Sequence, residues 1–314
     1  MTDNPFLFSI LIANYNRGTY IEECLNSTLL QTYQNIEIVI VDDGSTDNSV
    51  AIIKEYLQKD NRIKFFPQSV NEGCGSAMKK CADLSIGRWF AFLGSDDVLL
   101  PEAVAILVAG HIATPECSIV YSNHYVCDDK LTIQRKSYGA EKIPDGESYL
   151  SHGKGITGIA SFARNYYDQT EGINPNFKRA VDQDIYYKME EVGSVFFIDK
   201  PTCFYRVNDQ GISTQKNISK ARYWFVRAKE NARQRRLAKP SVMNINEKEL
   251  DAWWSILYVS KSSEALQQWK ICTGIYWLVL SLRKSILDRH MTLKLRILFM
   301  NGILHRVYGR LRQP

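Results

Sequence analysis

Residues 36–41, Ile-Glu-Ile-Val-Ile-Val, constrain the fold most, because the run is almost continuously apolar and has no regular polar face. Such a strand is normally covered on both faces, as in a parallel sheet with helices on either side. Four further runs predict strands at residues 8–13, 63–66, 89–93 and 119–126. Helical patterns lie between them near residues 21–29, 50–57 and 101–108. This alternation predicts an α/β fold with an open, mostly parallel, doubly wound, Rossmann-like sheet.

The charge is distributed unevenly along the chain. Residues 1–215 carry 19 Lys and Arg against 28 Asp and Glu, a net charge of −9, whereas residues 216–314 carry 20 against 6, a net charge of +14. We therefore expect a catalytic domain at residues 1–215 and a basic, helical C-terminal region at residues 216–314. The acidic part suits metal-assisted chemistry, and the basic part is expected to attract a polyanionic partner.

Several protein classes are disfavoured. The seven cysteines form no Cys-x-x-Cys pair and the N-terminus has no signal-peptide pattern, which predicts reduced thiols in a cytoplasmic protein without a zinc site. The first apolar run ends in Ala-Asn-Tyr-Asn-Arg-Gly rather than Gly-x-Gly-x-x-Gly, and no Walker motif is present. A dehydrogenase, a methyltransferase or a P-loop enzyme is therefore not the favoured interpretation.

Acidic residues follow two of the predicted strands. Asp42-Asp43 comes after the second run and Asp96-Asp97 after the fourth, and a third cluster contains Asp182 and Asp184. Adjacent carboxylates are costly unless a positive group joins them, and a divalent cation carrying a diphosphate is one such group. Each cluster can also be explained without a ligand, as a polar turn with a helix cap or as acids in a first helical turn. The shared sheet edge favours a common site, because the strand ends meet at one crevice.

The motifs closely resemble family 2 glycosyltransferases with the GT-A fold over roughly residues 6–215. The matching segments are Ser-Ile-Leu-Ile-Ala-Asn-Tyr-Asn at 9–16, Ser27 to Gln31, Ile-Val-Ile-Val-Asp-Asp-Gly-Ser-Thr-Asp at 38–47, Asn-Glu-Gly at 71–73, Phe-Leu-Gly-Ser-Asp-Asp at 92–97, Asp-Gln-Asp at 182–184, Tyr-Arg-Val-Asn at 205–208 and Ile-Ser at 212–213.

The resemblance implies roles for individual residues. Ala13 and Tyr15 would hold the nucleotide base, Tyr15 by stacking, and Asp42 would hydrogen-bond that base, usually uracil. Asp96 would lie near the ribose and Asp97 would contact Mg²⁺ or Mn²⁺. The remaining implied roles are the general base for Asp182 and a donor contact for Lys79, which stands beside Met78 where relatives carry an Arg. Arg206 is expected on a mobile segment that closes over the diphosphate, and the alternative is an ordinary surface arginine.

The function that the resemblance implies is inverting transfer of a sugar, from a nucleotide sugar such as a UDP-sugar to an acceptor hydroxyl. A lipid-linked or cell-surface glycan is the expected acceptor. Gly94 and Val181 stand where relatives often carry acids, and Asn208 where many carry a His. These departures keep open a second interpretation, a catalytically degenerate module that binds a nucleotide or glycan without turnover.

The basic region has its own pattern. Residues 271–282 are uncharged and mostly apolar but too few to span a bilayer. Leu293 to Arg312 alternates apolar with basic residues, as in helices that lie on anionic lipid, so we expect a peripheral position on the inner face of the membrane. The alternative is a helical subdomain that packs on the catalytic part or a second subunit. Nucleic acid is not expected, because no recognition module accompanies the charge.

Overall fold

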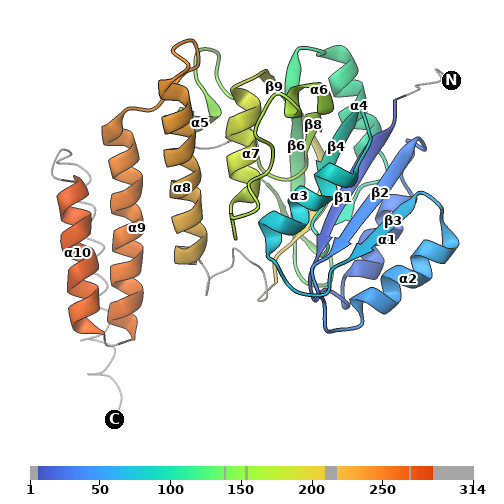
Figure 1. Cartoon of the computed structure of the whole chain (residues 1–314), viewed down its shortest axis with the longest axis horizontal. Helices are drawn as coiled ribbons and strands as arrows, with labels where there is room; N and C mark the ends of the chain where they lie inside the picture. The colour runs from blue at the N-terminus through green and yellow to red at the C-terminus, as the bar shows by residue number, and fades with distance from the viewer. Residues whose placement is uncertain (1–5, 138, 153–154, 209–217, 269, 286–314) are drawn as a thin grey trace.

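The computed structural model describes residues 6–137, 139–152, 155–208, 218–268 and 270–285. One large sheet carries helices on both faces, and three long helices follow in a row beyond it (Figure 1). The strands are β1 (Phe8–Asn14), β2 (Ile36–Asp42), β3 (Ile63–Pro67), β4 (Trp89–Phe92), β5 (Val98–Leu99), β6 (Cys117–Cys127), β7 (Ile133–Lys136), β8 (Ala160–Ala163) and β9 (Ser194–Arg206). The helices are α1 (Ile21–Leu29), α2 (Ser49–Lys59), α3 (Cys74–Leu84), α4 (Ala103–Ala113), α5 (Tyr149–His152), α6 (Arg164–Tyr167), α7 (Val181–Glu190), α8 (Ile218–Leu237), α9 (Glu247–Gln267) and α10 (Ile271–Ser285).

The predicted α/β sheet is confirmed. The strand order is β3-β2-β1-β4-β8-β6-β9-β5, with β7 paired to β6. The first four strands are parallel, and all five predicted strands form. Beyond β4 the sheet is mixed, because β8 runs antiparallel to both of its neighbours. The carboxyl ends of β2, β1 and β4 therefore meet at one edge.

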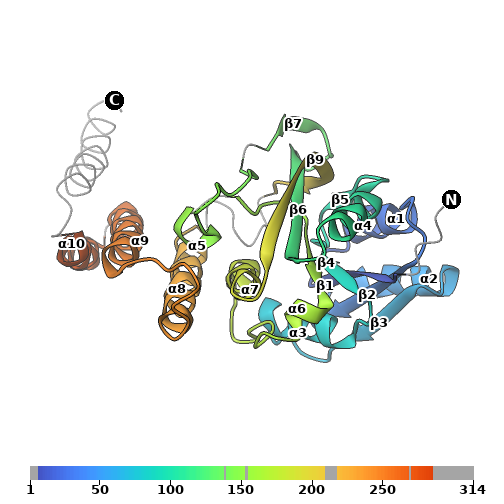
Figure 2. The same cartoon turned by 90° about the horizontal axis from the view of Figure 1, so that it is seen from above.

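The apolar runs are continuous because both faces of the sheet are covered. Leu11 and Val39 face a core that includes α3 and α7, whereas Ile10 and Ile38 face a second core that includes α1, α2 and α4. Alternate side chains of a strand point to opposite faces, so a strand between two helical layers has no polar side. Figure 2 shows these two layers on either side of the strands.

Glu37 is the one polar side chain in the run at residues 36–41, and it is 3% exposed. Burial alone would raise its pKa, but hydrogen bonds from Lys64, Ser9 and the Ile86 N–H outweigh burial and lower it. The carboxylate is therefore held by the neighbouring strands.

Four strands were not predicted: β5, β7, β8 and β9. The sequence pattern left residues 128–180 as loops, yet β8 lies there, completely buried between β4 and β6. It has only four residues, too few for a periodicity to be recognised. The long strand β9 was also missed, and its pairing with β6 is broken by three register shifts.

The described part of the basic region packs on the catalytic part. α8 contacts α7, α9 contacts α8, and α10 contacts α9 (Figures 1 and 2). Arg236 is fully buried and pairs with Glu190 at 2.7 Å, and Arg235 pairs with Glu191 at 3.0 Å. Part of the positive charge of residues 216–314 is thus neutralised by α7.

Within the described residues, no helix is both long enough and apolar enough to cross a bilayer. The boundary placed between residues 215 and 216 lies outside the described residues, as do Ile212-Ser213 and the amphipathic stretch from Leu293 to Arg312.

Candidate active site

Asp42 ends β2 and is 1% exposed. Its carboxylate accepts hydrogen bonds from Asn14 Nδ2 at 2.7 Å, Ser45 Oγ at 2.7 Å and Ser45 N–H at 2.8 Å. Asn14 is its direct neighbour in the β1–β2 register. An ionised carboxylate has about four acceptor positions, so one remains after these three bonds. Asp42 is therefore a fixed acceptor at the carboxyl end of the sheet.

Asp43 is also buried, but its carboxylate binds a different loop from that of Asp42. Its oxygens accept from Gln68 Nε2 at 2.7 Å, Glu72 N–H at 2.8 Å and Gly73 N–H at 2.9 Å. These bonds fix the loop that leads into α3. Gly44 follows with φ +74°, and a Cβ there would lie 2.8 Å from the Val70 carbonyl carbon, so only glycine fits this close approach.

The loop after β1 joins Asp42 to the second acidic pair. Asn16 N–H donates to Ser45 Oγ at 2.8 Å, and Arg17 Nε donates to Asp96 Oδ2 at 3.3 Å. Asp96 Oδ2 also accepts from Asn208 Nδ2 at 3.1 Å. Tyr15, between these anchors, is 43% exposed, so its ring is available to an incoming planar group.

Asp97 is buried beside Asp96. Burial, followed by the charge of Asp96, raises the pKa of Asp97 well above its usual range, while Arg206 acts in the opposite direction. A Cβ on Gly94 would lie 2.6 Å from Asp97 Oδ2 and 3.2 Å from Asp96 Oδ1. A side chain at position 94 would therefore collide with the Asp97 carboxyl group, so glycine allows both acids to lie directly against the backbone there.

This arrangement fits a divalent cation bound together with a diphosphate. No group of three or more His, Cys, Asp and Glu side chains in the described part of the chain is placed to hold a metal ion. Mg²⁺ and Mn²⁺ bound with phosphates often need only one or two protein carboxylates. Asp97 and Asp96 supply those two, and a cation would relieve their repulsion.

Arg206 is held in place rather than mobile, which corrects the expectation of a mobile segment at this residue. It is the last residue of β9, and its N–H donates to Asp97 Oδ1 at 2.9 Å. Its guanidinium, 2% exposed, donates to Asp96 O at 2.8 Å, pairs with Glu23 and lies 4.7 Å over the Tyr20 ring. Its place at the end of β9 and these four contacts fix Arg206 beside the acidic pair.

Asp182 and Asp184 lie in the first turn of α7 in contrasting surroundings. Asp184 is 1% exposed and pairs with Lys188 at 2.9 Å and Arg235 at 3.5 Å. Asp182 is exposed, and its carboxylate accepts a hydrogen bond from the side chain of its neighbour Gln183 at 3.3 Å. Protein nevertheless surrounds the other sides of the Asp182 carboxyl, and this desolvation raises its pKa above 3.8. Of the two, only Asp182 is open to a substrate.

Tyr205 connects the two ends of the site. Burial raises the pKa of its phenol to about 12, and the charges of Asp97, Asp96 and Asp182 all add to this shift. The three carboxylates therefore lie within electrostatic reach of one ring. Tyr205 is also 41% exposed, so it faces the space into which these groups open.

One implied residue, Lys79, lies apart from this cluster. Lys79, on α3, forms an ion pair with Asp83 one turn along the same helix at 2.6 Å. Met78 is buried in the core rather than directed at the acidic groups. Ala13 lies in β1, half-buried, immediately before Asn14 and Tyr15.

Sequence reasoning missed three residues that contact or surround the acidic pair: Arg17, Tyr205 and Asn208. The position of Arg17 was predictable from the sequence. A cation in the loop after the first strand lies at the same sheet edge as acids that follow a neighbouring parallel strand. Tyr205 and Asn208 lie in the matching segment at residues 205–208, but neither was assigned a role from the sequence, because their position beside the acidic pair depends on how β9 packs in the sheet.

Comparison with known proteins agrees with this geometry. The model of "Glycosyl transferase family 2" matches residues 9–183, more than half of the chain. Chondroitin synthase of Escherichia coli is 32% identical over 206 residues, which cover 64% of this chain and 29% of that protein. Glycosyltransferase GlyG of Streptococcus pneumoniae is 34% identical over 123 residues, which cover 39% of this chain and 40% of that protein. The chain thus spans less than a third of the length of the chondroitin synthase.

Solved structures support the same fold. S. aureus TarS 1-349 superimposes with a TM-score of 0.57 at 16% identity, covering 89% of this chain and 91% of that one. The mannosyltransferase PcManGT of Pyrobaculum calidifontis gives a TM-score of 0.50 at 13% identity, covering 90% and 87%. With the family model matched across the strands that carry Asp42, Asp96 and Asp97, the chain belongs to glycosyl transferase family 2.

Proposed function

We propose that this chain is an inverting glycosyltransferase that transfers a sugar from a nucleotide sugar to an acceptor hydroxyl. The observation that carries the proposal is the grouping of Asp42, Asp96 and Asp97 at one sheet edge, with the exposed Asp182 carboxyl within electrostatic reach of the same Tyr205 ring as Asp96 and Asp97. The first three suit a nucleoside diphosphate with a cation, and the fourth suits a hydroxyl that must lose a proton.

The nucleotide end is assigned to the loop after β1. Asp42 keeps one acceptor position after its three protein hydrogen bonds, which suits an N–H of a pyrimidine base. The exposed ring of Tyr15 suits stacking on the same base, and we assign the half-buried Ala13, two residues earlier, to the same base-binding segment. S. aureus TarS has been solved with UDP-GlcNAc, and PcManGT with GDP-Man and Mn²⁺. We infer a UDP-sugar, because a single acceptor suits the N–H of uracil.

The diphosphate end is assigned to Asp96 and Asp97. Asp97 would hold Mg²⁺ or Mn²⁺, which when bound neutralises charge on the departing diphosphate. Arg206 keeps Asp97 oriented through its N–H and supplies a fixed positive charge behind both acids. Arg17 and Asn208 orient Asp96, which leaves that carboxylate free to accept from a ribose hydroxyl on its open side. We assign Lys79 no part in donor binding, because its ammonium group pairs with Asp83.

Asp182 is proposed as the general base. Its raised pKa makes its carboxylate a stronger proton acceptor than an ordinary Asp, and its exposure lets an acceptor hydroxyl approach. A single base, with no second carboxylate placed as a nucleophile among the described residues of the site, implies direct displacement. The sugar therefore inverts at its anomeric carbon.

The acceptor is proposed to be a lipid-linked or cell-surface glycan, reached by a cytoplasmic protein at the inner face of the membrane. The support is the basic charge of residues 216–314 together with the alternation of apolar and basic residues from Leu293 to Arg312 in the sequence. Since α8 to α10 pack as a continuous layer, we assign them to the protein body and assign lipid contact to the residues that follow. Flotation with phosphatidylglycerol and with neutral liposomes, comparing the full chain with one ending at Ser285, tests this assignment. Equal flotation of both proteins would contradict it.

Donor hydrolysis tests the reaction itself. Purified protein should hydrolyse one nucleotide sugar from a panel of UDP- and GDP-sugars when Mg²⁺ or Mn²⁺ is added, and ¹H NMR of the released or transferred sugar should report the inverted anomer. A retained anomer would refute the single displacement. UDP binding with neither hydrolysis nor transfer would instead support the degenerate binding module, which the glycine at position 94 makes the second candidate.

A further inference from the structure

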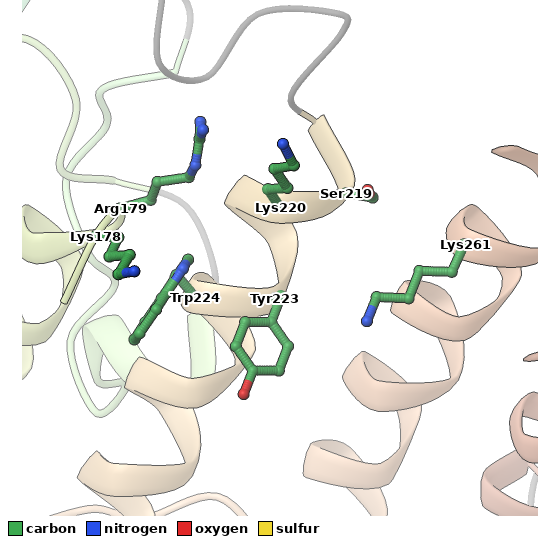
Figure 3. Close-up of a pocket in the computed structure, with 7 residues that line it drawn as sticks. All are labelled: Lys178, Arg179, Ser219, Lys220, Tyr223, Trp224 and Lys261. Atoms are coloured by element: carbon green, nitrogen blue, oxygen red, sulfur yellow. The ribbon is translucent and has the colours of Figure 1, made fainter. Parts of the chain in front are cut away.

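A second concave site lies next to the proposed active site and has a different chemical character. It is a pocket of about 420 Å³ lined by Lys178, Arg179, Ser219, Lys220, Tyr223, Trp224 and Lys261 (Figure 3). These residues come from the segment before α7, from the first turns of α8 and from α9. The pocket therefore exists only because the C-terminal helices pack beside α7.

The charge of the pocket is strongly positive. Four of its lining residues are cationic and none is acidic. Glu264 lies just behind, where it accepts from Ser219 Oγ at 2.7 Å, and it can offset only one of the four charges. Lys178 and Lys220 are exposed, so their ammonium groups can meet a ligand without first being uncovered. A ligand with one or more oxyanions fits this surface.

Aromatic rings form the rest of the wall. Trp224 packs on Phe177 at 5.0 Å and against Tyr223 at 5.6 Å, so the rings are fixed by the protein. Lys261 lies 5.3 Å over the Tyr223 ring and 4.3 Å over the Trp277 ring, and burial lowers the pKa of its ammonium group. Half-buried aromatic faces give apolar surface to the C–H face of a sugar ring. Inorganic ions would leave that surface unused.

The pocket is close to the proposed base. Arg179 precedes Asp182 by three residues, so their Cα atoms are at most about 11 Å apart. The two side chains also act on the same thiol: after burial, Asp182 and Asp43 raise the pKa of Cys74 to about 12, and Arg179 opposes them. A short glycan can therefore reach from the pocket to the Asp182 carboxylate.

We propose that this pocket binds an oxyanion-bearing sugar of the acceptor, a phosphate or carboxylate group being held by Lys178, Lys220 and Arg179 while the ring rests on Tyr223 and Trp224. The inference rests on the proposed transferase function and defines its acceptor as an anionic glycan. Asp182 would then act on a hydroxyl of the same chain, near the anchored sugar.

The test is binding of defined probes to the full chain, measured by saturation-transfer NMR and calorimetry. The probes are glucose 6-phosphate, glucuronic acid, neutral glucose and inorganic phosphate. We expect at least one anionic sugar to bind more tightly than both inorganic phosphate and glucose. The two anionic sugars distinguish a phosphate from a carboxylate ligand. Affinity should fall as salt is raised from 50 to 500 mM, in proportion to screening of exposed charges.

Three matched variants assign the binding to the pocket. Lys178→Ala and Lys220→Ala should each weaken binding of the anionic sugar about fivefold, the scale of an exposed ion pair. Lys248→Ala removes an exposed lysine of α9 outside the pocket and should leave binding unchanged. Donor hydrolysis should be unchanged in Lys248→Ala, because this lysine lies outside both the pocket and the proposed nucleotide site.

Several results would overturn the proposal. If glucose and glucose 6-phosphate bind equally well, the charge of the pocket does not contribute to binding. If inorganic phosphate binds as tightly as the anionic sugars, the aromatic rings do not contribute. Unchanged affinity in both pocket variants would place binding elsewhere. If the parent protein binds none of the sugars and the pocket variants no longer float with phosphatidylglycerol liposomes, the pocket is a lipid-binding site. Absence of donor hydrolysis in the parent protein would refute the transferase function rather than the pocket. The binding measurements would still show which of the probes the pocket binds.

Discussion

Asp182 and Asp184 allow one substitution to be tested at two positions of the same helical turn, with opposite expected results. Asp182→Asn removes an exposed carboxylate that has no ion-pair partner among the described residues. Asp184→Asn removes a buried one that joins Lys188 at 2.9 Å and Arg235 at 3.5 Å. Asparagine matches aspartate in size, so each variant isolates the effect of the charge.

The expected stabilities follow from these contacts. Breaking a buried ion pair costs about 3–5 kcal/mol. We expect a loss at the lower end of this range for Asp184→Asn, because both cations retain another partner. Arg235 still pairs with Glu191 at 3.0 Å, and the Lys188 ammonium group still donates to the Gly172 carbonyl at 2.8 Å. A loss of about 3 kcal/mol corresponds to a fall in Tm of roughly 5–10 °C for a domain of this size.

Asp182→Asn should have no such cost. Because its folded pKa is raised above 3.8, the stability that the protonated Asp182 contributes at low pH is lost as the pH rises through the folded pKa. At neutral pH the ionised group is therefore a net cost, and Asn should leave Tm unchanged or slightly higher. Transfer should fall about a hundred- to ten-thousandfold through loss of the base.

The assay measures both properties in each protein, Tm by circular dichroism and transfer by release of UDP. Parent activity should also decline as the pH falls through the raised pKa of Asp182, at a higher pH than an ordinary Asp would give. An inactive but stable Asp184→Asn protein beside an active Asp182→Asn protein would refute the assignment and move the base by two residues.

Three further predictions concern other parts of the site and its support. Asp97→Ala should remove metal-stimulated transfer and EDTA should have the same effect on the parent, whereas full activity in EDTA would exclude a metal role for Asp97. Asp42→Ala should weaken UDP binding in calorimetry by about 1.5–3 kcal/mol, the scale of a charge-assisted hydrogen bond, and unchanged affinity would show that the base binds elsewhere. Arg236→Met should lower the free energy of urea unfolding by about 3–5 kcal/mol, because it removes an ion-pair partner of Glu190 and of Glu191. Arg227→Met breaks a more exposed pair with Glu230 and should cost at most about 1 kcal/mol. Similar losses in the two variants would mean that α8 is not anchored through Arg236.

The amino-acid sequence was sufficient to predict the parallel half of the fold and the edge that carries the acidic groups. An unbroken apolar run such as residues 36–41 is stable only between two apolar layers, and the carboxyl ends of parallel strands meet at one edge whatever surrounds them. These are consequences of local periodicity. They hold for β1 to β4, and they place Asp42 and Asp96 near each other before any long-range contact is known.

Only the tertiary structure distinguished residues that look alike in sequence. Asp42 and Asp43 are adjacent, yet one anchors the β1 loop and the other the loop before α3, because successive side chains leave a strand end in opposite directions. Asp184 is enclosed by Arg235, which is 51 residues away, while Asp182 stays open. The basic pocket likewise joins residues 178 and 179 to α8 and α9. Charge and periodicity describe neighbours along the chain. Burial, pairing and pockets depend on which distant elements pack together, and that packing decided which of the two acids stays exposed.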